Sequence, residues 1–197
     1  MADFFDVVLG QRAYRQLKPD PVPDDVVMRI LEAATHAPSE ENHQPWEFIV
    51  VRDEATRQAI GRVTQEVWEA FGREYARGQL TPKFFEAVDQ WATGGLAAAP
   101  VHVVICGNTE RTPEEQLPSS IFPAVQNLLL AACALGLGSL MSTLSVTNRA
   151  AFSPVLGLPA HIVPLALVPL GWPERALGPA RREPVEEHLH RDRWGGR

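Results

Sequence analysis

The sequence predicts one α/β domain, of the α+β kind, that spans residues 1–197. This length suits a single domain, and the content of 45% hydrophobic and 21% charged residues is ordinary for a globular protein. Segments with apolar residues at helical spacing alternate with short apolar runs that are typical of buried strands. These runs cover residues 48–51, 101–106 and 162–168.

Charge and cysteine content exclude some classes of function. The formal charge of −6 argues against a general nucleic-acid binder, which usually has a basic face. Cys106 and Cys133 both lie in apolar surroundings, so we expect reduced, buried thiols rather than a disulfide framework. The N-terminus has no basic segment followed by an apolar core, so no signal peptide is expected and we predict a cytoplasmic protein.

The N-terminal region predicts a short helix over residues 3–10, followed by Gln11-Arg12-Ala13-Tyr14-Arg15. Arg12 and Arg15 are spaced so that one turn or loop could present both to an anion. Arginine suits phosphate because its planar guanidinium donates paired hydrogen bonds. The alternative, two solvated arginines beside a helix end, is about as well supported by spacing alone.

The next helix is predicted over residues 25–36, with Val27, Ile30, Leu31 and Ala34 on one buried face. It is expected to end at Ala37, because a proline follows and disfavours the α conformation in the residue before it. The loop that follows lies between two prolines and carries short polar side chains. They suit either a plain helix-to-strand connection or a site that grips a planar polar ligand. These residues are Pro38, Ser39, Asn42, Gln44 and Pro45.

A long helical stretch is predicted over residues 53–77, with one buried stripe. The stripe consists of Ile60, Val63, Val67 and Phe71. Residues 78–95 are harder to interpret. The segment could be an amphipathic helix that packs on the body through aromatic side chains. These side chains are Phe84, Phe85 and Trp91.

Residues 116–148 contain no charge and are long enough to span a bilayer. Prolines and glycines divide this run, so we instead predict a helix over residues 120–135 that is buried on most sides. So much buried surface in a small chain predicts a large subunit interface. We therefore expect an obligate homodimer and no membrane partner.

The remaining segments complete the predicted order. Residues 140–144 are expected to be extended, residues 148–156 helical, and residues 169–173 a turn after the last strand. His188 and His190 near the C-terminus could suggest a metal, but two imidazoles on an exposed tail are usually ordinary polar residues, so no metal site is predicted.

Several of these segments resemble the FMN-dependent nitroreductase family, in the right order along almost the whole chain. Residues 38–46 read Pro-Ser-Glu-Glu-Asn-His-Gln-Pro-Trp, like the family signature Pro-Ser-x-x-Asn-x-Gln-Pro-Trp. Residues 126–132 match its central Gln-Asn-Leu-x-Leu-Ala-Ala helix, and residues 169–173 its Pro-Leu-Gly-Tyr-Pro turn, with tryptophan for tyrosine. The resemblance implies a nitroreductase-like fold, with a central, mainly antiparallel sheet flanked by helices in an intertwined homodimer.

The resemblance also implies a set of FMN-binding residues. The phosphate would lie on Arg12, Arg15 and Arg182, with Arg181 as a helper, although Gln11 and Ala13 stand where the family has an arginine and a serine. A backbone N–H would meet the reactive N5 atom of the flavin along residues 142–144. The family region that matches residues 78–95 often covers the substrate side of the flavin, so Phe84, Phe85 and Trp91 could do so here. The predicted cofactor-binding residues are therefore Gln11, Arg12, Ala13, Arg15, Pro38, Ser39, Asn42, Gln44, Ser142, Thr143, Leu144, Arg181 and Arg182.

No motif of another catalytic class is present, and flavins bring their own redox chemistry. The resemblance implies an enzyme that passes electrons from NADPH or NADH to a small-molecule acceptor, such as a nitroaromatic or a quinone, in a ping-pong cycle. Alternatives are a non-catalytic protein that binds or stores FMN, a relative that destroys flavin or removes halogens, and a dimeric structural protein without cofactor.

Overall fold

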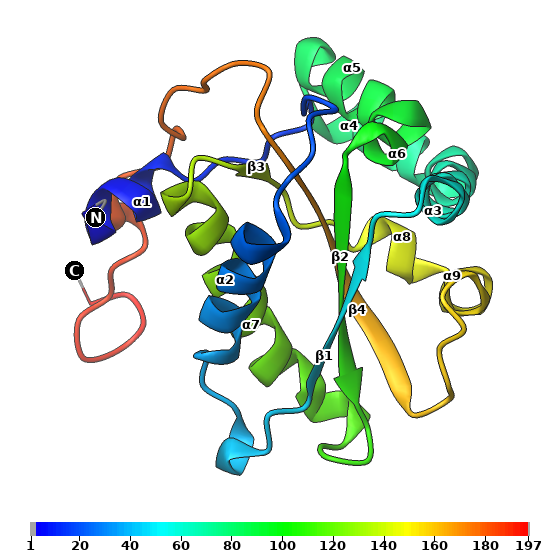
Figure 1. Cartoon of the computed structure of the whole chain (residues 1–197). Helices are drawn as coiled ribbons and strands as arrows, with labels where there is room; N and C mark the ends of the chain where they lie inside the picture. The colour runs from blue at the N-terminus through cyan, green and yellow to red at the C-terminus, as the bar shows by residue number, and fades with distance from the viewer. Residues whose placement is uncertain (1–2, 197) are drawn as a thin grey trace.

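The computed structural model describes residues 3–196, and its centre is a four-stranded sheet (Figure 1). The strand order is β1-β2-β4-β3, and all neighbouring strands are antiparallel. The strands are β1 (Trp46–Val51), β2 (Val101–Asn108), β3 (Gly138–Ser139) and β4 (Ile162–Gly171). The predicted antiparallel sheet of an α+β fold is confirmed.

Strand β2 forms the middle of the protein, and every residue before Asn108 is buried. Successive side chains of a strand point to opposite faces. Val103 and Ile105 accordingly join one hydrophobic cluster, whereas Val104 and Cys106 join another on the far side of the sheet. Helices therefore cover both faces, which explains why this strand is apolar throughout rather than alternating.

One face of the sheet is covered by α2 (Asp24–Thr35) and α7 (Leu117–Ala134) (Figure 1). With the turn before it, α7 is long and apolar enough to cross a membrane by length and composition. Its buried residues, such as Ile121 and Leu128, pack into the core beside α2 and the sheet. This location accounts for the lack of charge. The helix begins three residues before its predicted start.

The opposite face is covered by the helices that follow β1 and those between β3 and β4 (Figure 1). The predicted helix over residues 148–156 is confirmed, since Asn148 caps its first turn by accepting a hydrogen bond from the N–H of Ala151 at 3.2 Å. These helices are α3 (Glu54–Val67), α4 (Arg73–Gln79), α5 (Pro82–Gln90), α6 (Leu96–Ala98), α8 (Leu144–Thr147) and α9 (Arg149–Val155).

The predicted stripe along residues 53–77 is wrong at its last member. Ile60, Val63 and Val67 are buried, but Phe71 is 50% exposed. A π-helical turn over Trp68–Gly72 adds a residue to the repeat. It rotates the following residues around the helix axis, so that Gly72 and Ala76 rather than Phe71 face the core.

Two other boundaries differ from expectation. Strand β4 continues through Gly171, where a turn was predicted from residue 169, because Leu170 and Gly171 pair with β3. Leu144 begins helix α8 instead of continuing an extended segment.

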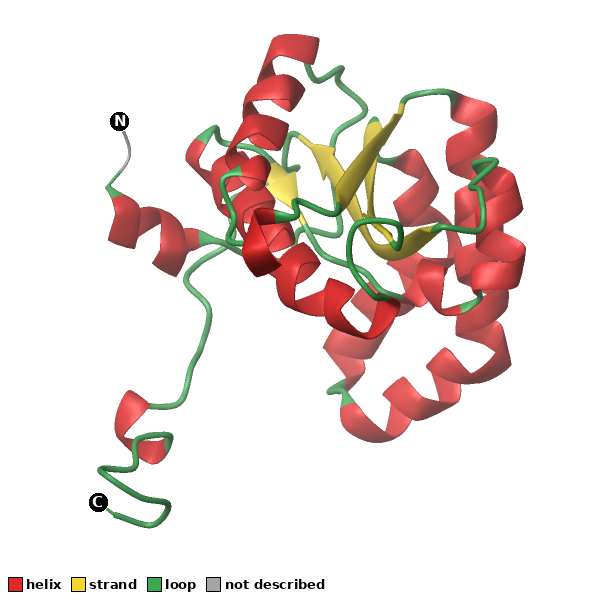
Figure 2. Ribbon diagram, turned by 90° about the horizontal axis from the view of Figure 1, so that it is seen from below, coloured by secondary structure: helices red, strands yellow, loops and turns green. Residues whose placement is uncertain are grey.

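Both ends of the described chain lie outside the main body (Figure 2). Helix α1 (Phe4–Gly10) buries none of its residues, and Phe4, Phe5 and Leu9 are largely exposed. The C-terminal segment runs away from the sheet and ends in a small loop (Figure 2), and Trp194 near its end is 88% exposed. Large apolar side chains thus remain uncovered at both ends.

Candidate functional site

The predicted arginine segment lies along the short strand β3. The N–H of Tyr14 donates to the carbonyl of Ser139 at 3.0 Å, and Ala13 forms a bridge with the same serine. Gly138 makes this close approach possible, because a Cβ atom there would lie 2.7 Å from Cδ2 of Leu17. The pairing fixes the direction in which the side chains of residues 12 and 15 leave the backbone.

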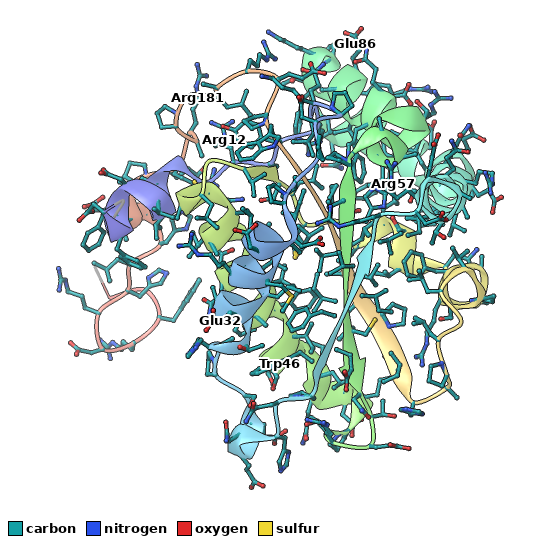
Figure 3. The ribbon with its side chains drawn as sticks, viewed as in Figure 1. Arg12, Glu32, Trp46, Arg57, Glu86 and Arg181 are labelled. Carbon is teal, nitrogen blue, oxygen red and sulfur yellow. The ribbon has the colours of Figure 1, made fainter. Side chains whose placement is uncertain are left out.

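The C-terminal segment closes over the arginine segment. The guanidinium of Arg12 donates to the carbonyl of Gly178, and the N–H of Leu177 donates to the hydroxyl of Tyr14 at 3.4 Å. These contacts bring together residues that are 166 and 163 positions apart in the sequence. Figure 3 shows the Arg12 and Arg181 side chains at the same end of the molecule.

A cavity of about 710 Å³ lies between these segments, within the usual size of a small-molecule site. Six of the predicted cofactor residues line it, namely Gln11, Arg12, Ala13, Arg15, Arg181 and Arg182. Leu129, Leu140 and Met141 provide an apolar part of the wall. The structure therefore brings both halves of the predicted phosphate site to one place.

The charge of this cavity is one-sided. Four arginines line it, and the described lining residues include no aspartate or glutamate. Arg15 lies with its guanidinium carbon 4.8 Å from the centre of the Phe84 ring, and burial lowers the pKa of this arginine. A phosphate would offset that desolvation through paired, charge-assisted hydrogen bonds. The donor set and the apolar wall thus fit FMN.

Residues 142–144 do not line the cavity, but they lie directly beyond Met141. Two of their three backbone N–H groups already donate a hydrogen bond within the described chain. The N–H of Ser142 donates to Leu167 of β4 at 2.8 Å, and the N–H of Leu144 donates to the Ser142 hydroxyl at 3.2 Å. Among the three, Thr143 alone keeps an N–H with no hydrogen-bond acceptor within residues 3–196. It is the residue best placed to offer a donor to a ring at this edge.

The other predicted cofactor residues lie at the opposite end of the sheet. The loop that holds Pro38, Ser39, Asn42 and Gln44 leads into Trp46, which pairs with Gly107 at one end of β2. The arginine cavity adjoins β3, which pairs with the far end of β4. The eight residues of β2 span roughly 25 Å at about 3.3 Å per residue. Within one chain, the two groups therefore do not meet.

That loop carries an unusual amount of backbone strain. Glu41, Asn42 and Gln44 all have positive φ angles, of 47°, 60° and 50°. Asparagine tolerates this conformation better than the other two. Local hydrogen bonds hold the strained turn, because the Ser39 hydroxyl accepts from the N–H of Gln44 at 3.1 Å and the Ser120 hydroxyl accepts from the N–H of Glu40 at 3.2 Å. Such strain concentrates at functional sites.

Replacing Glu41 with glycine is expected to raise the free energy of unfolding by about 1 kcal/mol, because glycine adopts positive φ without steric conflict. Among the described residues, the substitution removes one ion pair, with His43 at 3.4 Å, which is exposed and stabilises little. Glu40 has a helical backbone and supplies the matched control. Glu40→Gly should lower stability in urea titrations, and a decrease for both variants would contradict the assignment of strain.

Sequence reasoning missed several residues at this site, including Leu129, Leu140 and Met141, which line the cavity, and Tyr14 beside it. The apolar ones carry no polar signal and are indistinguishable from core positions in the sequence. Tyr14 lies inside the arginine segment but was passed over, although its hydroxyl connects that segment to the C-terminal one. Its position between Arg12 and Arg15 could have directed attention to it.

Comparison with known proteins supports one family. The family model described as Nitroreductase family matches residues 8–172. An NADH dehydrogenase from Thermus thermophilus is 32% identical over 193 residues, with 90% of each chain covered. A 5,6-dimethylbenzimidazole synthase from Rhodospirillum rubrum is also 32% identical, over 95% of this chain and 86% of that protein.

The fold agrees with these matches. A crystal structure of a nitroreductase-like protein from Desulfovibrio desulfuricans, in complex with FMN, superposes with a TM-score of 0.77 at 25% identity. It covers 98% of this chain and 99% of the other. The family match extends from the arginine segment through the last strand, which includes most of the cavity described above. The chain belongs to the nitroreductase family.

Proposed function

We propose that this protein is an FMN-dependent oxidoreductase that passes electrons from NADH or NADPH to small acceptors such as nitroaromatics and quinones. The observation that carries the proposal is the cavity lined by four arginines and an apolar wall, with no carboxylate among its described lining residues. The FMN complex of a relative with the same fold supports it. A cytoplasmic location suits an enzyme that draws on pyridine nucleotides and carries free cysteines.

In this proposal the chain binds and orients the cofactor. Arg12, Arg15 and Arg182 hold the phosphate, with Arg181 beside them, and Gln11 and Ala13 offer an amide side chain and a backbone N–H. Leu140 and Met141 contact the ring, and the free N–H of Thr143 donates at its reactive edge. When bound, FMN supplies the redox chemistry, accepting hydride from the nucleotide and passing electrons to the acceptor.

We further propose a homodimer in which the second copy completes the site. Pro38, Ser39, Asn42 and Gln44 are too far from the arginines of their own chain to touch the same cofactor. The exposed apolar residues of α1 and of the C-terminal segment support an extensive interface. Light scattering at micromolar concentration is expected to give twice the chain mass of 21.7 kDa. A monomer under those conditions would contradict this arrangement.

Steady-state kinetics test the proposed activity. Initial rates measured with several concentrations of NADH or NADPH against several of a quinone should give parallel double-reciprocal lines, because both substrates use the same site in turn. Intersecting lines would contradict a ping-pong cycle. No turnover with either nucleotide, for protein that has retained FMN, would contradict the reductase assignment.

A protein that binds FMN without this activity is the second candidate. Gln11 and Ala13 stand where the family has an arginine and a serine that bind the phosphate. This difference favours a protein that binds FMN but uses it in another way. A relative named 5,6-dimethylbenzimidazole synthase is as similar to this chain as the NADH dehydrogenase. Bound FMN that neither nucleotide reduces would favour this second candidate.

A further inference from the structure

A second cavity, of about 580 Å³, adjoins the first. The two cavities share four lining residues, namely Arg12, Ala13, Arg15 and Phe84. From there the second cavity extends between helix α5 and the loop that follows strand β4. Its outer part is formed by residues that belong to none of the motifs assigned to FMN.

Two of these residues are cations. Lys83 comes from the first turn of α5, and Arg175 comes from the loop after β4. Neither forms an ion pair with any residue from 3 to 196, and Glu174 is the one acidic residue in the described lining. The outer part of the cavity therefore carries a net positive charge of its own, in addition to the arginines of the phosphate site.

The wall between the two charged regions is aromatic. Phe84 is 43% exposed and faces Arg15, and the almost completely buried Trp91 also lines this cavity. A planar ring can pack against such a wall. The second cavity thus combines a flat apolar surface with cations at its rim, which is the pattern expected for an aromatic anion.

The elements that carry these cations are held in place. The Asp89 carboxylate of α5 accepts from Trp68 Nε1 at 2.8 Å and from Arg73 Nε at 2.8 Å, and so ties α5 to the helix before it. The N–H of Glu174, next to Arg175, donates to the carbonyl of Gln16 at 3.3 Å. The backbones that carry both cations are therefore positioned before any ligand arrives.

We propose that this second cavity binds the electron acceptor and selects planar aromatic acceptors with a carboxylate or sulfonate, whose charge is recognised by Lys83 and Arg175. The inference rests on the proposed function. For a nitroaromatic acid, the nitro group takes two electrons and two protons, loses one oxygen as water and becomes a nitroso group. NAD(P)H supplies both electrons and one proton as hydride and leaves as NAD(P)⁺, and solvent supplies the second proton.

The test compares 4-nitrobenzoate with the neutral 4-nitrobenzyl alcohol on the FMN-loaded protein. For wild type, kcat/KM should favour 4-nitrobenzoate, and added salt should reduce this preference because it screens the charges. Lys83→Ala and Arg175→Ala should each lower kcat/KM for 4-nitrobenzoate by about tenfold and leave the alcohol nearly unchanged. Arg29→Ala, which removes an exposed arginine of α2, is the matched control and should behave as wild type.

A binding measurement makes the test independent of turnover. Calorimetric titration of 4-nitrobenzoate into the oxidised protein should give a Kd that is about tenfold weaker for Lys83→Ala than for Arg29→Ala. An equal loss for both acceptors, or an unchanged Kd, would overturn the proposal. If Lys83→Ala and Arg175→Ala raised only the KM for the nucleotide, the proposal would also be overturned, because the two cations would then recognise nucleotide phosphates.

Failure of the proposed function has a different signature. If neither nucleotide reduces the bound FMN, the reductase assignment fails, but the titration still reports whether the cavity binds an aromatic anion. Charge reversal adds a second check. Lys83→Glu should favour the cationic 4-nitrobenzylamine over 4-nitrobenzoate, and an unaltered order of preference would count against Lys83 as the residue that recognises charge.

Discussion

Replacing Arg182 with alanine is expected to weaken FMN binding by about ten- to a hundredfold, which corresponds to roughly 1.5–3 kcal/mol for one charge-assisted hydrogen-bonding group. Arg182 lines the arginine cavity, and within residues 3–196 its guanidinium donates only to the neighbouring carbonyl of Arg181. It therefore has donors left for a ligand. Quenching of flavin fluorescence on titration with protein would give the Kd.

Two variants make this result specific. Arg182→Lys keeps the charge but lacks the planar pair of donors, so its affinity should lie between those of wild type and Arg182→Ala. Arg29→Ala removes a cation far from the cavity and should leave the Kd unchanged. If Arg182→Ala binds FMN as tightly as Arg29→Ala does, the assignment of the phosphate to this end of the sheet is wrong.

Acidification is expected to destabilise the protein through His102. This residue lies on β2, is completely buried, and points toward the side of the sheet that α3 and α6 cover. Its Nε2 atom lies 2.8 Å from the carbonyl of Leu96, whereas the buried Nδ1 atom has no hydrogen-bond partner among the described residues. Burial, with Arg57 nearby, lowers the pKa of His102 to about 4.

The sign of the effect follows from linkage. The folded protein keeps His102 neutral to about pH 4, whereas the unfolded chain takes up its proton near pH 6.5. The unfolded state thus binds more protons between these values, so stability is complete above pH 6.5 and falls as the pH decreases. A difference of this size corresponds to about 3 kcal/mol, to be measured by urea titration across the interval.

His102→Gln provides the control, because an amide can still donate to the Leu96 carbonyl but does not titrate. The variant should lose most of the pH dependence between pH 6.5 and 4, whatever its stability at neutral pH. The Asp89 carboxylate does not interfere, because hydrogen bonding by Trp68 lowers its pKa and its contribution is lost only at still lower pH. An unchanged slope in His102→Gln would contradict the account.

Much of the fold could be predicted from local pattern. The continuous apolar run of β2 and the helical segment over residues 148–156 are short-range signals, and both elements form where the sequence places them. Phe71 could not be placed, because the π-turn at Trp68–Gly72 depends on packing across the sheet rather than on local spacing. Strand β4 continues to Gly171 because its end pairs with β3. This pairing joins segments about thirty residues apart, so local pattern does not reveal it.

The arginines of the phosphate site could be predicted from the sequence, but the full set of residues that line the two cavities could not. Arg12 and Arg182 were recognised through resemblance, and their proximity needed the fold because they lie at opposite ends of the chain. Lys83 and Arg175 were not predicted at all. Each is a single cation outside the recognised motifs, where charge usually means solvent exposure, and only the shared cavity relates them to the arginines.

The most direct test of the central claim is a visible absorption spectrum of the purified protein, recorded before and after anaerobic addition of NADH or NADPH. We predict a flavin band that bleaches with at least one nucleotide, which would establish the cofactor and the first half-reaction together. A band that neither nucleotide bleaches would contradict the reductase assignment. A protein that stays colourless after incubation with FMN would contradict the flavin site itself.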